Sequence, residues 1–192
     1  MTQNNRPSYL SFGLAWLLGY GAFALSYGSD PPVPAALAGA LLFGGLVLAL
    51  VITGVGAARA LRGAHGRDAV IGKLLAAAWL IGFGALSILI QAASTALDEP
   101  EVQTLLWPTG AGLVVGMIYL AGGVAYRDAL QYALGAWLAL LSSAALFLNG
   151  ANLYWALAVI GGGGYLVAAV LEPRRSTAES GHAVRDPAVR SR

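Results

Sequence analysis

Ionisable side chains, which acid–base catalysis, proton relays and ion-coupled transport normally require, lie outside the long apolar runs of this sequence. Asp98, Glu99 and Glu101 share one short acidic segment, and the two histidines, His65 and His182, are far apart along the chain. Cysteine is absent, so neither a thiolate nucleophile nor a cysteine-based metal site is available. We therefore expect no enzyme activity, no catalytic or metal site and no cofactor.

Six uncharged polar side chains remain inside the apolar runs. They are Thr53, Ser87, Gln91, Thr109, Ser142 and Ser143. Each is predicted to make a packing hydrogen bond, because lipid offers no partner of its own. Gln91 stands toward the end of its run, and Thr109 is also a candidate for lining the path of an uncharged solute.

An aromatic octapeptide is repeated along the chain. Residues 15–22 (AWLLGYGA) return as residues 78–85 (AWLIGFGA), and a fainter echo begins at Ala136. Each copy opens an apolar run that a second, glycine-bearing run follows, which indicates a repeating hairpin of two helices. The repeated tryptophans are Trp16, Trp79 and Trp137. They are predicted to anchor helix packing or an interfacial belt, and the alternative is a ring of aromatic side chains lining a solute path.

Glycine supplies 26 residues and two informative patterns. Gly112 and Gly116 fall on one helix face, where the absence of side chains lets a neighbouring backbone approach closely. The run of four consecutive glycines consists of Gly161, Gly162, Gly163 and Gly164. Packing is its predicted role, and an unwound hinge of the kind that transporters use at binding sites is the alternative.

Composition places these elements in a bilayer. Apolar residues make up 58% of the 192, charged residues make up 10%, and the mean hydropathy is +0.70, whereas soluble domains carry about 25% charge. The sequence predicts an all-α integral membrane protein of six helices, arranged as three hairpin pseudo-repeats. The predicted spans cover residues 9–27, 35–58, 71–95, 105–126, 129–148 and 152–171. Residues 1–8 precede this domain, and residues 172–192 are expected to form a disordered basic tail.

The basic residues predict the orientation. With six spans, all 11 Lys and Arg fall on one side of the membrane, and the opposite connections hold only carboxylates. The positive-inside rule then places both termini in the cytoplasm, with the domain in the plasma (inner) membrane. A net charge of +2 is too small to indicate nucleic acid as a partner. Arg174 and Arg175 are expected to meet anionic lipid head groups, and Asp128 and Glu172 to be solvated beside basic neighbours.

The repeated pattern resembles a known family. Residues 17–21 (LLGYG), the proline-bearing outer turn and residues 116–123 (GMIYLAGG) are similar to the short two-helix repeat of HdeD-like membrane proteins. That resemblance covers all six spans as an apolar and glycine pattern and implies a role in acid-stress resistance. It carries no functional residue over to this chain. The chain also looks like the small multi-pass proteins that are labelled as permeases.

Together these patterns predict a non-enzymatic multi-pass membrane protein with a stress-related or accessory role. A homo-oligomer or another membrane protein is the expected partner besides the lipid bilayer. The alternative is a permease or channel for a small uncharged solute. Its path would be lined by Trp16, Trp79, Trp137 and Thr109.

Overall fold

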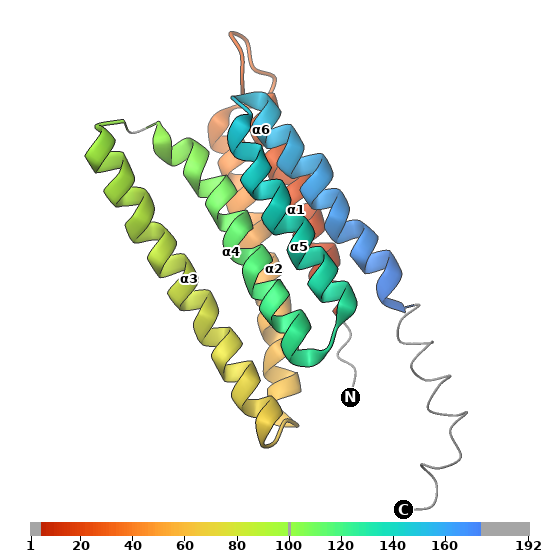
Figure 1. The fold of residues 1–192 in the computed structure, drawn as a ribbon. Helices are drawn as coiled ribbons and strands as arrows, with labels where there is room; N and C mark the ends of the chain where they lie inside the picture. Colours follow the sequence, from red (N-terminus) through yellow and green to blue (C-terminus); the bar gives the residue numbers. More distant parts are fainter. Residues whose placement is uncertain (1–4, 100, 174–192) are drawn as a thin grey trace, which may run out of the picture.

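The computed structural model of the chain describes residues 5–99 and 101–173, and six helices in these ranges are long and apolar enough to cross a membrane (Figure 1). Their bounds are α1 Arg6–Leu25, α2 Ala35–Arg62, α3 Arg67–Leu97, α4 Val102–Tyr126, α5 Ala129–Ala144 with a 3-10 turn Ala145–Phe147, and a sixth span Ala151–Pro173. The prediction of an all-helical, multi-pass membrane protein is confirmed at this level.

The sixth span changes its helical form partway along. It begins as α6 (Ala151–Trp155), continues as a π-helix (Ala156–Gly162) and returns to α-helix over residues 163–173. A π-helix is a wider turn that is rare and frequently occurs at functional sites. The four consecutive glycines lie where the π-helix ends, so this run is helical rather than unwound.

Four spans form the core of the bundle, and α2 and α3 are peripheral. In the apolar 18-residue segment of α1, 56% of the residues are buried, whereas 17% and 11% are buried in the corresponding segments of α2 and α3. The α2 helix packs mainly on α1, and α3 packs mainly on α4. Consequently α3 stands at one edge of the bundle (Figure 1).

The helices α2 and α3 run further than the predicted spans because their charged ends continue the helical backbone. Arg59 and Arg62 lie in the last turn of α2, where positive charge interacts favourably with the helix dipole. The α3 helix has 31 residues and is therefore about 46 Å long, against about 30 Å of hydrocarbon. Its ends can thus reach the interface while its middle stays in lipid.

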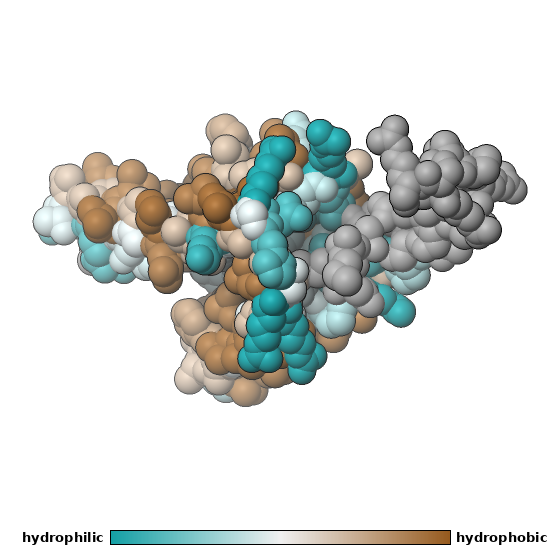
Figure 2. Space-filling model, turned by 90° about the horizontal axis from the view of Figure 1, so that it is seen from below, coloured by the Kyte–Doolittle hydropathy of each residue, from teal (hydrophilic) through white to brown (hydrophobic). Residues whose placement is uncertain are grey.

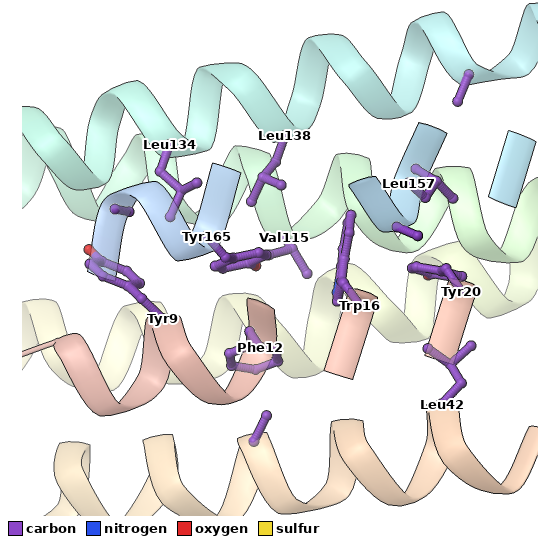
Figure 3. Close-up of a cluster of buried hydrophobic side chains, with 14 of the residues drawn as sticks. Tyr9, Phe12, Trp16, Tyr20, Leu42, Val115, Leu134, Leu138, Leu157 and Tyr165 are labelled. Atoms are coloured by element: carbon purple, nitrogen blue, oxygen red, sulfur yellow. The ribbon is translucent and has the colours of Figure 1, made fainter. Parts of the chain in front are cut away.

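The core is built around aromatic side chains of α1. Tyr9, Phe12, Trp16 and Tyr20 follow one another at spacings of three and four residues, which places them on one helix face. Figure 3 shows this face pointing at Tyr165 of the sixth span, with Leu134 and Leu138 of α5 and Val115 of α4 nearby. All of these side chains are buried.

The two ends of the described chain meet. The backbone N–H of Asn5, which precedes α1, donates to Oε1 of Glu172 at 3.0 Å. Glu172 is only 1% exposed. Its carboxylate lies at the N-terminus of α1, where the helix dipole favours negative charge. Asp128 is also buried and caps α5 by accepting from the N–H of Gln131. The expectation that these two carboxylates are solvated is therefore wrong.

Polar side chains gather at this same end of the molecule, as Figure 2 shows from below. The predicted tail begins later than expected, since Glu172 and Pro173 still belong to the sixth span. The remainder of the tail, including Arg174 and Arg175, lies outside the described residues.

Candidate functional site

Trp16 is packed into the centre of the core. Its side chain is 3% exposed, and its ring lies 5.2 Å from that of Tyr20 and 5.6 Å from that of Tyr165. Trp79 stacks on Phe83 at 5.8 Å and contacts Tyr119, which in turn contacts Tyr165. A chain of aromatic contacts therefore links α3, α4, the sixth span and α1.

Trp137 has different surroundings. Its side chain is 50% exposed on α5, and its indole Nε1–H donates to the backbone oxygen of Ile160 at 3.1 Å. The structure thus joins Trp16 and Trp79 through other rings and places Trp137 on the surface of the bundle.

Thr109 follows a proline that interrupts the backbone hydrogen bonds of α4. Pro108 lies inside α4 and has no N–H, so it cannot bond the carbonyl of Thr104 four residues earlier. The hydroxyl of Tyr154, from the sixth span, donates to that carbonyl at 3.1 Å. Thr109 is buried, and its own hydroxyl donates to the carbonyl of Leu105 at 2.7 Å. These bonds satisfy polar groups that lipid would leave unpaired.

The other polar candidates are divided among helix faces. Ser143 donates to the carbonyl of Ala139 one turn earlier. The hydroxyls of Ser142 and Thr53 are buried and have no hydrogen-bond partner among the described residues. Ser87 and Gln91 lie on α3, away from these groups.

Gly112 and Gly116 face α5 at close range. A Cβ at Gly116 would stand 2.5 Å from the backbone nitrogen of Ala139 and 2.8 Å from the oxygen of Gly135. A Cβ at Gly135 would in turn stand 2.7 Å from the oxygen of Gly116. At Gly112 a Cβ would fall on the hydroxyl of Ser142. The α4 and α5 backbones are therefore in direct contact at this crossing.

The four consecutive glycines have four different neighbours. A Cβ at Gly161 would lie 2.7 Å from the ring of Trp16, and one at Gly162 would lie 3.0 Å from the backbone nitrogen of Leu17. At Gly164 it would lie 2.8 Å from the ring of Trp137, whereas at Gly163 it would meet no atom within 4 Å. Gly163 faces open space.

That open space is part of a groove between α5 and the sixth span, with a volume of about 430 Å³. The residues that line it are Leu130, Ala133, Leu134, Trp137, Val159, Ile160, Gly163, Gly164, Val167, Ala168 and Leu171. The sequence patterns did not predict this groove. Small residues on both helices were its only signal, and they form a groove only once α5 and the sixth span are known to be neighbours.

A second surface lies on α3. Leu80, Gly84, Ser87 and Gln91 follow a spacing of four, three and four residues, which puts them along one stripe of the helix. Leu80 is 79% exposed, and a Cβ at Gly84 would meet no atom within 4 Å. A surface hollow of about 570 Å³ includes Ser87 and Gln91. We call these four residues the α3 stripe.

Within residues 5–99 and 101–173, no group of three or more His, Asp or Glu side chains could hold a metal ion. No family model, curated protein or solved structure matches the chain. The resemblance to HdeD-like proteins and the stress-related role that it implies stay predictions.

Proposed function

We propose that this chain is a non-enzymatic accessory component of the plasma (inner) membrane that binds another transmembrane helix along the α3 stripe. The observation that carries the proposal is the open stripe itself, with a large apolar side chain, a glycine and two polar side chains at the spacing of a helix–helix contact. Its partner is a second copy of the chain or another membrane protein.

The chemistry of the α3 stripe fits a helix better than lipid. Lipid tails are as apolar as leucine, so association in a bilayer depends on close packing and on hydrogen bonds between helices. Gly84 provides space for a neighbouring backbone, and Ser87 and Gln91 provide hydrogen-bonding groups. Gln91 Oε1 accepts only a long bond, 3.5 Å, from Gln103 Nε2. A partner helix would supply shorter bonds than this one.

A permease for an uncharged solute has less support. Its expected path includes Trp16 and Thr109, and both side chains are buried in protein contacts. Trp137 is half exposed beside a different pair of helices. The permease alternative stays a prediction of the sequence pattern.

The proposal includes three hairpins and cytoplasmic termini. Support for the repeat comes from Gly19 and Gly82, which occupy equivalent places in the two octapeptides. A Cβ at Gly19 would lie 2.6 Å from Cα of Leu42 on α2, and one at Gly82 would lie 2.9 Å from the side chain of Val114 on α4. Each glycine therefore faces the second helix of its own hairpin.

Cysteine labelling tests the proposed orientation. The chain has no native cysteine, so Ser29→Cys and Gly63→Cys each introduce a single thiol. A membrane-impermeant maleimide is expected to label Ser29→Cys in intact cells and Gly63→Cys only after lysis, because the basic connection lies inside. Labelling of Gly63→Cys in intact cells would overturn the orientation.

Photo-crosslinking tests the partner surface. A benzoylphenylalanine at Leu80, on the α3 stripe, is expected to give a discrete crosslinked protein in cells, because a bound helix would lie within reach. Leu89 is the matched control, since it lies on the opposite side of α3 and is 61% exposed. There the probe should react with lipid alone. The mass of the product distinguishes a second copy from another protein.

Gly84→Leu provides the second arm of this experiment. The leucine has room in the isolated chain, because no atom lies within 4 Å of its Cβ, but it would fill the space for the partner backbone. The product from Leu80 should then disappear while the chain stays folded. Equal crosslinking from Leu80 and Leu89, or a product that Gly84→Leu leaves unchanged, would contradict a partner helix at the α3 stripe.

A further inference from the structure

We propose that one anionic phospholipid binds at the basic end of the bundle, where α2, α3 and α4 meet, and that Arg62, Lys73 and Arg127 hold its phosphate group. The site shares no residue with the α3 stripe. It therefore does not depend on the proposed partner helix.

Three helix ends meet at Gly72, in the second turn of α3. A Cβ at Gly72 would lie 2.6 Å from the side chain of Leu61, in the last turn of α2, and 3.6 Å from the hydroxyl of Tyr126, the last residue of α4. Elsewhere α2 packs mainly on α1, and α3 packs mainly on α4. The ends of α2, α3 and α4 are therefore neighbours toward the lower end of the bundle (Figure 1).

Each of these three contact residues is followed in the sequence by a basic residue with an exposed side chain. The basic residues are Arg62, Lys73 and Arg127. Asp68, one turn before Gly72, is the only carboxylate in residues 59–73, which contain four Lys and Arg. Asp128 is buried and caps α5. The surplus charge at the meeting point is therefore positive, and a phosphate group complements it.

The depth of these residues indicates lipid head groups. Lys73 lies 24 residues from Leu97, at the far end of α3, and Tyr126 lies 24 residues from Val102, at the far end of α4. Along their helices both are about 36 Å from the acidic end of the bundle, which carries Asp98. The hydrocarbon of a bilayer is about 30 Å thick, and the head groups extend the total to about 40 to 45 Å. With the acidic end at the opposite boundary of the hydrocarbon, Lys73 and Tyr126 stand in the head-group layer.

Apolar side chains lie next to the site on its hydrocarbon side. Leu74 follows Lys73 toward the middle of α3, Val124 precedes Tyr126 by two residues, and both side chains are exposed. Acyl chains can cover these side chains while the phosphate stays beside the basic residues. A soluble phosphate would lack this apolar contact, so the arrangement favours a phospholipid.

The bound phosphate would join three helices. An arginine side chain can donate two hydrogen bonds to one phosphate, and a lysine adds a compact positive charge. Arg62 belongs to α2, Lys73 to α3, and Arg127 to the turn after α4. One phosphate between them therefore links the edge helix α3, which packs mainly on α4, to α2 as well.

Native mass spectrometry of the full chain in detergent tests the site. The purified, delipidated protein is titrated with phosphatidylglycerol and, separately, with phosphatidylcholine that has the same acyl chains. We expect one phosphatidylglycerol to bind about tenfold more tightly than phosphatidylcholine. Inorganic phosphate should not displace it, because the acyl chains contribute to binding. Displacement by inorganic phosphate, or equal affinity for the two lipids, would overturn the phospholipid site.

Matched variants on α2 locate the head group. Arg62→Gln should weaken phosphatidylglycerol binding by about fivefold, and Arg62→Lys, which keeps the charge, should restore most of it. Arg59→Gln is the control, because Arg59 is also exposed but lies nearly opposite Leu61 on the helix. It should leave binding unchanged. Equal losses from Arg59→Gln and Arg62→Gln would overturn the site in favour of general attraction to the basic end.

A triple variant tests the three basic residues together. Arg62→Gln combined with Lys73→Gln and Arg127→Gln should bring the two lipids to equal affinity. All three side chains are exposed, so the variant should melt at the wild-type temperature in lipid-free detergent, and Arg62→Gln alone replaces it otherwise. A preference for phosphatidylglycerol that survives the loss of all three charges would overturn the proposed head-group contact.

Discussion

Replacing Gly116 by alanine is expected to lower the free energy of unfolding by about 3 kcal/mol, at the upper end of the usual cost of overpacking. The new methyl group would stand 2.5 Å from the backbone nitrogen of Ala139 and 2.8 Å from the oxygen of Gly135. Neither atom belongs to a side chain that could rotate away. The α4 and α5 helices would have to separate, and both belong to the core of the bundle.

Thermal unfolding of the purified protein in one detergent, at one scan rate, measures this effect. Gly44→Ala is the matched control, because it makes the same chemical change on α2 where no atom lies within 4 Å. It should leave the melting temperature unchanged or raise it, since alanine favours a helix more than glycine does. A loss at Gly116 no larger than that at Gly44 would mean that the two backbones are not in contact.

The spans and the importance of this glycine face could be predicted from the sequence, but the opposing helix could not. Hydropathy shows where a chain crosses a bilayer because the difference between water and lipid is large. The choice between a protein neighbour and lipid involves two apolar surroundings, so composition hardly distinguishes them. Gly112 and Gly116 therefore signalled a close contact, while Gly135 and Ser142 were identified only by the structure.

The repeated tryptophans also have surroundings that the sequence did not predict. Their sequence contexts are similar, yet Trp16 is almost fully buried and Trp137 is half exposed. The difference arises because α1 lies between α2 and the sixth span, whereas the Trp137 side of α5 borders the groove. The similar local sequences predicted similar helices. They did not predict where each helix lies in the bundle.

Glu172 failed as a sequence prediction for a related reason. Its neighbours along the chain are Pro173 and two arginines, which indicated a solvated end. Its neighbours in space include Asn5, which is 167 residues away and offers a backbone N–H at the start of α1. A carboxylate can be buried where a helix N-terminus faces it, and local charge patterns do not contain that information.

Gly161→Ala and Gly163→Ala are expected to change stability in opposite directions, although the two sites are two residues apart in one run. At Gly161 the methyl group would lie 2.7 Å from the ring of Trp16, which Tyr20 and Tyr165 hold in place. We expect a loss of about 1 to 3 kcal/mol from this overpacking. At Gly163 the methyl group meets open space, so the higher helix propensity of alanine should keep stability equal or raise it by up to about 1 kcal/mol.

The pair of variants separates packing from hinge motion in the glycine run. If the run serves packing, only Gly161→Ala should lower the melting temperature, and any activity should fall only as far as folding does. If the run bends during function, both alanines should stiffen the helix. Gly163→Ala should then abolish any transport or stress phenotype that the wild type shows, while melting at or above the wild-type temperature. We expect the first pattern, because residues 163–173 are α-helical and Gly161 already fits the core tryptophan. The second pattern would instead favour a moving sixth span and the permease alternative.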